Sequence, residues 1–245
     1  MEPFPLLAPD AGVDGIEIRV TTRRGGVSQA PYESLNLGDH VGDASHCVEE
    51  NRRRVSAQLP TQDIHWIRQV HGIVSVEAGI RSVPEADAQW TCERCQPLAV
   101  LTADCLPVVL ADREARCVGI AHAGWRGLAA GVLESLLQAM PVETGSVTAW
   151  LGPAISAAAY QVGPEVRDAF ERADGDATTA CFAPSERDGL WMADLAALAR
   201  LRLSRAGVST ITGGGRCTYG EPEHFFSHRR DGAQTGRMAT LVWLS

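Results

Sequence analysis

Three residues of this sequence combine reactive side chains with positions suited to catalysis: His71, Cys105 and His122. Cys105 precedes a short apolar, strand-like run and His122 ends another, so both are expected where a buried strand meets an open cleft. Two imidazoles and one thiolate are a known ligand set for tetrahedral zinc. Three protein ligands leave the fourth position open, which is typical of a catalytic site and indicates a metalloenzyme.

The spacing of these residues leaves other interpretations open. They lie 34 and 17 residues apart, which does not match the tight ligand pairs of a structural zinc finger. A buried cysteine with two surface histidines is a second interpretation. A third needs no metal: Cys105 would be a thiolate nucleophile and a histidine its general base.

Composition limits the class of protein. The 245 residues are 45% hydrophobic and 21% charged, which is ordinary for a globular chain that buries a large core. A net charge of −8 argues against a nucleic-acid partner bound by bulk charge. There is no signal-peptide pattern and no apolar run of about 20 residues, so no membrane association is expected. Seven scattered cysteines indicate a reducing environment rather than a disulfide framework. We expect a cytoplasmic monomer.

The elements that must position the three residues follow from hydrophobic periodicity. No repeat, low-complexity tract or long linker divides the chain, so one domain over residues 1–245 is expected. Residues 98–101, 106–110 and 117–121 have the continuous apolar character of central strands buried on both faces. The predicted fold is α/β, an α+β sandwich in which helices cover a central mixed sheet. Further strands are predicted at 15–22, 63–70, 73–77, 147–151, 208–212 and 238–244, and helices at 45–59 (with Ser45 as a possible cap), 128–140, 164–172 and 190–205.

A series of ordered motifs runs from about Arg19 to the C-terminus. These motifs are Thr21-Thr22-Arg23, Gly25-Gly26-Val27-Ser28, Ser34-Leu35-Asn36-Leu37-Gly38, Gln69-Val70-His71-Gly72, Thr102-Ala103-Asp104-Cys105-Leu106-Pro107, His122-Ala123-Gly124-Trp125-Arg126-Gly127, Leu151-Gly152-Pro153-Ala154-Ile155, Arg216-Cys217-Thr218-Tyr219, Phe225-Phe226-Ser227-His228-Arg229-Arg230-Asp231 and Thr235-Gly236-Arg237-Met238. The series resembles the bacterial laccase-domain family, also called the multicopper polyphenol oxidase or YfiH-type family.

The resemblance implies a catalytic zinc bound by His71, Cys105 and His122. It implies phosphorolysis of adenosine, inosine and methylthioadenosine by a purine nucleoside phosphorylase, with adenosine deaminase activity at the same site. The family fold resembles that of toxin deamidases with a Cys-His pair, and some members are linked to editing of peptidoglycan precursors. A Cys-His hydrolase or amidase, or a copper-dependent polyphenol oxidase, are therefore the alternatives. Copper chemistry of the multicopper kind needs many histidines, whereas this chain has seven and no His-X-His pair.

Four residues near these motifs are candidates for further roles. Asp104 could shuttle a proton or point into a backbone turn. Arg23, before two glycines, could cradle phosphate or be a solvated loop arginine, and Arg126 is a competing candidate for the same substrate-binding role. Asn36 could bind substrate or close a turn.

The remaining features are less specific. Cys92 and Cys95 form a Cys-X-X-Cys pair with no second pair at finger spacing, so an incidental loop is favoured over a redox or metal site. Gly215 stands where relatives of this type lead us to expect an aspartate, which puts any role of Arg216 in doubt. Arg229, Arg230 and Arg237 could reach phosphate, although pairing with acids is favoured.

Overall fold

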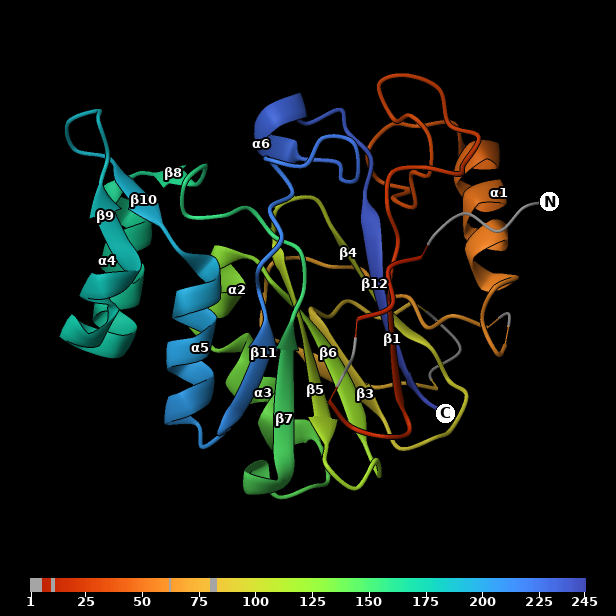
Figure 1. The fold of residues 1–245 in the computed structure, drawn as a ribbon, viewed down its shortest axis with the longest axis horizontal. Coiled ribbons are helices and arrows are strands. Elements are labelled where there is room, and N and C mark those ends of the chain that lie inside the picture. The colour runs from red at the N-terminus through yellow and green to blue at the C-terminus, as the bar shows by residue number, and fades with distance from the viewer. Residues whose placement is uncertain (1–5, 10–11, 62, 80–82) are drawn as a thin grey trace.

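The fold is built on two β-sheets packed face to face, with helices on both outer sides (Figure 1). The computed structural model describes residues 6–9, 12–61, 63–79 and 83–245. The larger sheet has the strand order β11-β7-β5-β6-β3-β2 and the smaller one the order β1-β12-β4. The strands of the larger sheet are β2 (Ser75–Glu77), β3 (Ala88–Thr91), β5 (Leu106–Asp112), β6 (Val118–Ala123), β7 (Val147–Leu151) and β11 (Thr210–Gly213); those of the smaller are β1 (Ile16–Val20), β4 (Leu98–Thr102) and β12 (Met238–Leu244).

Successive side chains of β5 point to opposite faces of the sheet, so this strand contributes to two hydrophobic clusters. Val109 and Ala111 face the smaller sheet, where they pack with Ile18 and Val100. Leu106, Val108 and Leu110 point to the opposite face and join the cluster formed with the helices. All seven residues of β5 are buried, as are all six of β6 and all five of β4, which confirms that these strands are covered on both faces. Strands β5 and β6 are central as expected, whereas β4 is an edge strand of the smaller sheet.

Helices complete the outer layers. Helices α2 (Trp125–Ala130), α3 (Val132–Ala139) and α5 (Leu195–Arg205) cover the outer face of the larger sheet. Helix α1 (Ser45–Ser56) covers the outer face of the smaller sheet through Val55, packed with Leu35, Leu37 and Leu241. The remaining elements are α4 (Pro164–Asp174), α6 (His228–Asp231), the 3-10 turns η1 (Thr144–Ser146) and η2 (Gly175–Cys181), and a small sheet of β8 (Gln161–Val162), β9 (Phe182–Pro184) and β10 (Trp191–Ala193).

The fold class is thus as expected: a mixed sheet, antiparallel at its centre and parallel at β7–β11 and β2–β3, flanked by helices. No helix among the described residues is long and apolar enough to cross a membrane.

Four local expectations were wrong. The helix expected over 128–140 is two helices, because Gly131 adopts φ 105° between α2 and α3. The segment expected at 190–205 begins as strand β10, and α5 starts only after Asp194, whose carboxylate caps it by accepting from the Ala197 N–H at 2.9 Å. Residues 63–70 form only isolated bridges, and Ser45 is not the cap of α1, because Ala44 holds that position. Strand β3 was not expected, and it proves essential to the site.

Candidate functional site

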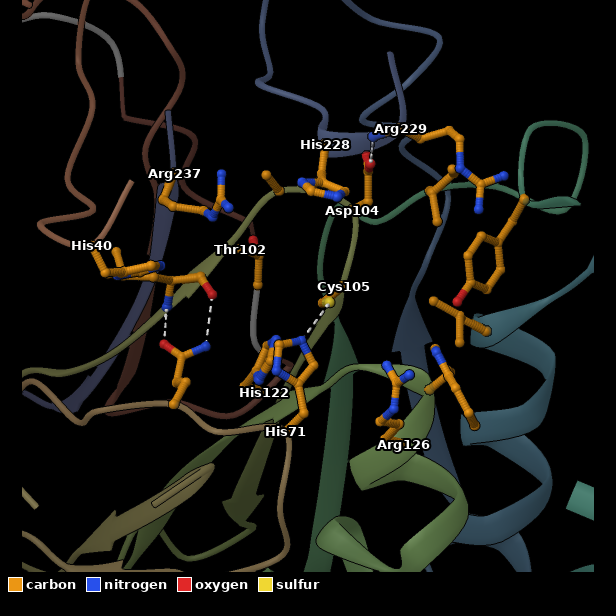
Figure 2. Close-up of a pocket in the computed structure, with 17 residues that line it drawn as sticks. His40, His71, Thr102, Asp104, Cys105, His122, Arg126, His228, Arg229 and Arg237 are labelled. Atoms are coloured by element: carbon orange, nitrogen blue, oxygen red, sulfur yellow. Dashed lines mark hydrogen bonds between the residues drawn. The ribbon is translucent and has the colours of Figure 1, made fainter. Parts of the chain in front are cut away.

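The three candidate ligands meet at one end of the larger sheet (Figure 2). Cys105 directly precedes β5, and His122 is the penultimate residue of β6. The register pairs Pro107 with His122, and this pairing of β5 with β6 brings the side chains of Cys105 and His122 close together. His71 comes from the loop after residue 70. The three ligand atoms lie within 4.8 Å of one another, and Cys105 Sγ is 3.9 Å from His71 Nε2.

One buried carboxylate, that of Asp87, orients both histidines. The His122 Nδ1 lies 2.8 Å from Asp87 Oδ1, an arrangement in which the ring donates to the carboxylate and presents Nε2 to the centre. The same carboxylate accepts backbone N–H groups from Val70 at 3.2 Å, His71 at 2.9 Å and Gly72 at 2.6 Å. Asp87 lies just before β3 and is fully buried. A histidine that binds a metal commonly donates its other nitrogen to such a carboxylate.

Close approach of the backbone at Gly124 keeps the centre compact. A Cβ at this position would lie 2.8 Å from His71 Cδ2 and 3.2 Å from Cys105 Sγ. Backbone conformation is unusual on both sides of the centre, since His71 has φ 61° and Asp104 has φ 89°. Such conformations are costly in residues other than glycine and gather at functional sites.

The charges of the centre reinforce one another. Burial alone would raise the pKa of the Cys105 thiol, but the charge and hydrogen bonds of His122 and His71 lower that pKa to about 6. Burial alone would lower the pKa of His122, whereas Cys105 and Asp87 raise it to about 9. Without a metal, the pair is therefore a thiolate beside an imidazolium near neutral pH.

A cavity of about 480 Å³ opens above the centre. Its walls are apolar and aromatic on the side of Trp125 and Tyr160, as is common in small-molecule sites. The lining also includes three guanidinium groups, those of Arg126, Arg229 and Arg237.

Asp104 lines the cavity, but its carboxylate is bound on the side away from the centre. Oδ1 accepts the Thr218 hydroxyl at 2.6 Å, and Oδ2 accepts the Ser227 hydroxyl at 3.0 Å and the Arg229 N–H at 2.7 Å. These contacts fix the segment that carries Arg229. Of the two roles expected for Asp104, the structure therefore favours the turn over the proton shuttle.

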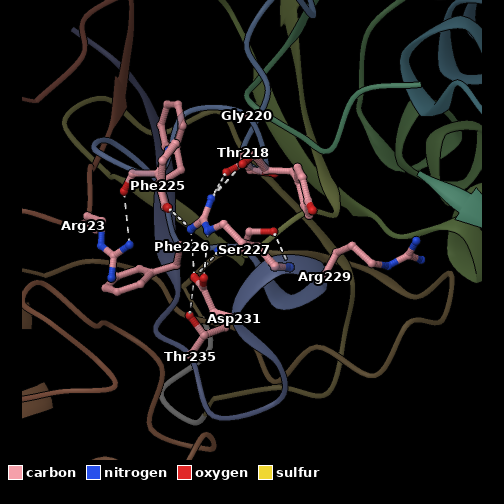
Figure 3. Close-up of polar contacts among 12 residues, drawn as sticks. Arg23, Thr218, Gly220, Phe225, Phe226, Ser227, Arg229, Asp231 and Thr235 are labelled. Atoms are coloured by element: carbon pink, nitrogen blue, oxygen red, sulfur yellow. Dashed lines mark hydrogen bonds and ion pairs between the residues drawn. The ribbon is translucent and has the colours of Figure 1, made fainter. Parts of the chain in front are cut away.

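Arg23 does not line the cavity. Its Nε donates to the Glu33 carbonyl and its Nη1 to that of Pro222, each at 3.1 Å. Its guanidinium carbon lies 4.8 Å from the centre of the Phe226 ring (Figure 3). The structure therefore places Arg23 outside the cavity, where its guanidinium holds two loops together, and its expected contact with phosphate stays a prediction.

Asn36 does not reach the cavity either. It is fully buried, its amide nitrogen donates to Gly38 O and Asp43 Oδ2, and its Oδ1 accepts from the N–H groups of Gly38 and Arg237. These contacts are those of the expected turn-closing role, and Asn36 is not among the residues that line the cavity. Of the expected substrate-binding residues, only Arg126 lines the cavity, where it lies over the ring of Trp125.

The other sequence features also find their places. Arg216 pairs with Glu221, so the missing aspartate at Gly215 is replaced by another acid. Arg230 pairs with Asp231, as favoured. Cys92 and Cys95 are exposed free cysteines outside the cavity, and neither belongs to a group of metal ligands among the described residues. Sequence reasoning missed Asp87 altogether and underrated Arg229 and Arg237.

The donor set could hold a metal ion. A tetrahedral ion such as zinc, with bonds of about 2.0–2.3 Å, needs ligand atoms roughly 3.5 Å apart. Cys105 Sγ and His71 Nε2 are 3.9 Å apart, and all three ligand atoms lie within 4.8 Å of one another. A lowered thiol pKa supplies the thiolate, and the Asp87 contact fixes the His122 tautomer. His71, Cys105 and His122 are the residues that would hold the ion.

The fold and the site together define the class of this protein: an α/β protein of two packed sheets with a His-Cys-His centre at one end of the larger sheet. The chain belongs to the multi-copper polyphenol oxidoreductase laccase family, whose model matches residues 17–245. It is 50% identical to a purine nucleoside phosphorylase of Pseudomonas aeruginosa over 92% of each chain. Purine nucleoside phosphorylase YfiH of Escherichia coli is 46% identical over 94% of each. The crystal structure of a Neisseria meningitidis protein, 47% identical, superposes with a TM-score of 0.92 over 98% of this chain and 99% of that one.

Proposed function

We propose that this protein is a cytoplasmic, monomeric zinc-dependent purine nucleoside phosphorylase that cleaves adenosine, inosine and methylthioadenosine and also deaminates adenosine. One observation carries the proposal: a His-Cys-His centre forms the floor of a cavity whose walls offer both aromatic surface and arginines. A purine needs the first kind of wall, and phosphate needs the second. The names of the Pseudomonas and Escherichia relatives support the same activity.

In phosphorolysis a phosphate oxygen forms a bond to C1′ of the ribose while the bond from C1′ to the purine nitrogen breaks. The leaving base gains the proton that the attacking hydrogen phosphate gives up, and ribose 1-phosphate remains. A bound zinc would supply a Lewis acid that polarises a substrate atom. The cavity arginines would hold phosphate and offset its charge, while Trp125 and Tyr160 would flank the purine and exclude water. His71 and His122, aimed by Asp87, would keep the centre in place during the reaction.

A second candidate function rests on a different reading of the same contacts. Cys105, His122 and Asp87 have the order of a nucleophile, a base and the group that orients the base. Without a metal, this arrangement would suit a Cys-His hydrolase or amidase, including one that edits peptidoglycan precursors. Copper-dependent oxidation of phenols is the third candidate, supported by the name of the family model. Among the described residues only one group of metal ligands occurs, whereas multicopper chemistry uses several metal sites.

The decisive experiment uses protein of known metal content. We expect the zinc form to convert adenosine and phosphate into adenine and ribose 1-phosphate, and to form inosine more slowly without phosphate. The metal-free form should do neither and recover on adding zinc. Cleavage of an amide by metal-free protein, blocked by alkylation of Cys105, would instead support the hydrolase. Turnover of a phenol only by the copper form would support the oxidase.

A further inference from the structure

The cavity is cationic in a protein that is acidic overall. The net charge is −8, yet Arg126, Arg229 and Arg237 all line the cavity. None of the three forms an ion pair with a carboxylate of the described ranges, unlike Arg216 and Arg230 just outside. Guanidinium groups that lack a protein counter-ion at a cavity wall attract an anionic ligand.

Arg237 differs from the other two because it is fixed before any ligand arrives. Its Nη1 donates to the carbonyls of Thr235 at 2.8 Å and Gly236 at 3.1 Å, and its backbone N–H donates to Asn36 Oδ1 at 2.9 Å. Within the described part of the chain, Nε and Nη2 make no hydrogen bond. Two adjacent donors in one plane are therefore left over, which is the pattern that binds two oxygens of one phosphate.

The loop before α1 is shaped around this side chain. A Cβ on Gly38 would lie 2.8 Å from Arg237 Cγ, so only glycine allows the present position of the arginine. Asn36 accepts the Gly38 N–H and the Arg237 N–H with the same oxygen, which ties the loop to β12. The buried asparagine thus positions Arg237 and leaves it little freedom to lose when an anion binds.

The two sides of the cavity differ in character. Arg237 and His40 lie on one side of Cys105, and Arg126 and Arg229 lie on the other (Figure 2). The latter two arginines lie over aromatic rings, with guanidinium carbons 4.4 Å from the Trp125 centroid and 5.3 Å from that of Tyr160. Arg237 lines the same cavity as Cys105 and Asp104.

We infer that Arg237, with His40 beside it, forms the phosphate subsite, and that the purine occupies the opposite, aromatic side. This inference rests on the proposed phosphorylase function and names where its second substrate binds. Nε and Nη2 of Arg237 hold two phosphate oxygens, and a third oxygen is free to attack C1′ of a ribose above the centre. Arg237 stays protonated throughout and transfers no proton.

The test compares Arg237→Gln, Arg237→Lys and Gly38→Ala with the exposed control Arg172→Gln on α4. Inorganic phosphate is titrated calorimetrically into each zinc-loaded protein, and KM for phosphate is measured with adenosine. Arg237→Gln should raise both the calorimetric dissociation constant and the KM for phosphate roughly 10- to 150-fold, which corresponds to the loss of one charge-assisted contact. Arg237→Lys should recover part of this loss, because it keeps the charge but not the fork. Gly38→Ala should weaken phosphate binding by displacing the arginine. In the Arg237 and Gly38 variants, deamination of adenosine, which uses no phosphate, should fall much less than phosphorolysis, and Arg172→Gln should change neither reaction.

The outcomes separate this inference from the proposed function. No ribose 1-phosphate from wild-type protein defeats the phosphorylase proposal, while the calorimetric titration still decides whether Arg237 binds phosphate. If Arg237→Lys and Gly38→Ala both bind phosphate as tightly as the wild-type protein, the assignment of the phosphate subsite to Arg237 is rejected, even if Arg237→Gln does not fold. Equal loss of phosphorolysis and deamination overturns it as well, because Arg237 would then shape the whole cavity.

Discussion

Asp87 and His122 are joined twice, once through the backbone and once through the side chains. The His122 N–H donates to the Asp87 carbonyl at 2.7 Å, and its Nδ1 lies 2.8 Å from the Asp87 carboxylate. The first contact belongs to the pairing of β3 with β6, and the second fixes the imidazole that faces Cys105. Since the same carboxylate accepts the His71 N–H, one side chain couples both histidines to the sheet.

The first prediction concerns that carboxylate. Asp87→Asn should weaken zinc binding by about 10- to 100-fold, because an amide is neutral and offers only one acceptor oxygen. Competition with a chromogenic chelator measures the affinity. The matched control is Asp112→Asn, since Asp112 is also a fully buried carboxylate but pairs with Arg116, away from the cavity. Unchanged zinc affinity in Asp87→Asn would remove Asp87 from the site.

The second prediction concerns Cys105 itself. Cys105→Ala should abolish nucleoside turnover, because a missing ligand lowers metal occupancy and removes the thiolate. The fold should survive, since three large apolar clusters hold the sheets and helices together independently of the centre. Circular dichroism, metal analysis and product assays check this, with the exposed Cys92→Ala as control. Full activity in metal-free Cys105→Ala would reject the metalloenzyme.

The third prediction concerns pH. An ordinary thiol has a pKa of about 8.5 and is mostly protonated at neutral pH. His122 and His71 outweigh burial and hold the Cys105 pKa near 6, so its thiolate fraction should rise as pH increases through 6 and level off above 7. In metal-free protein, alkylation of Cys105 by iodoacetamide, followed by peptide mass spectrometry, should show that profile. Cys117, whose pKa burial raises, should remain unreactive. A Cys105 rate that increases only above pH 8 would contradict the contacts described.

Sequence patterns predicted the parts of the fold that depend on local periodicity. The runs at 98–101, 106–110 and 117–121 correspond closely to β4, β5 and β6, because strands buried on both faces must be continuously apolar. The expected helix over 128–140 is interrupted at one residue, Gly131, whose φ is positive. Packing decides such a change of backbone conformation, and it leaves the helical spacing of the apolar residues unchanged.

The site was predictable only where residue type carries chemistry. His71, Cys105 and His122 could be singled out because imidazoles and thiolates are rare and reactive. Asp87 and Arg237 could not, because acids and arginines are common and their roles depend on burial and on contacts between distant segments. Arg237, for example, is held by Asn36, 201 residues earlier in the chain.

The fourth prediction concerns the backbone beside the centre. Gly124→Ala should disrupt the centre, because the new Cβ would lie 2.8 Å from His71 Cδ2 and 3.2 Å from Cys105 Sγ. The backbone conformation at residue 124 is extended and suits alanine, so the effect should come from the contact rather than from strain. Zinc affinity and turnover should decrease together. Gly145→Ala is the control, since a Cβ there would meet nothing within 4 Å.

The last prediction concerns Arg23, which the sequence motifs put forward for phosphate. Arg23→Ala removes two hydrogen bonds to backbone carbonyls and a cation–π contact with Phe226, so it should lower the free energy of unfolding by about 1–3 kcal/mol. It should leave KM for phosphate unchanged, because Nε and Nη1 of its guanidinium are bound to the Glu33 and Pro222 carbonyls and Arg23 does not line the cavity. Chemical denaturation and the phosphate titration measure the two effects in the same preparation. The neighbouring Arg24→Ala, which removes a largely exposed ion pair to Glu223, should change neither by much. A raised phosphate KM with normal stability in Arg23→Ala would instead return Arg23 to the binding site and require a movement of the loop that holds it.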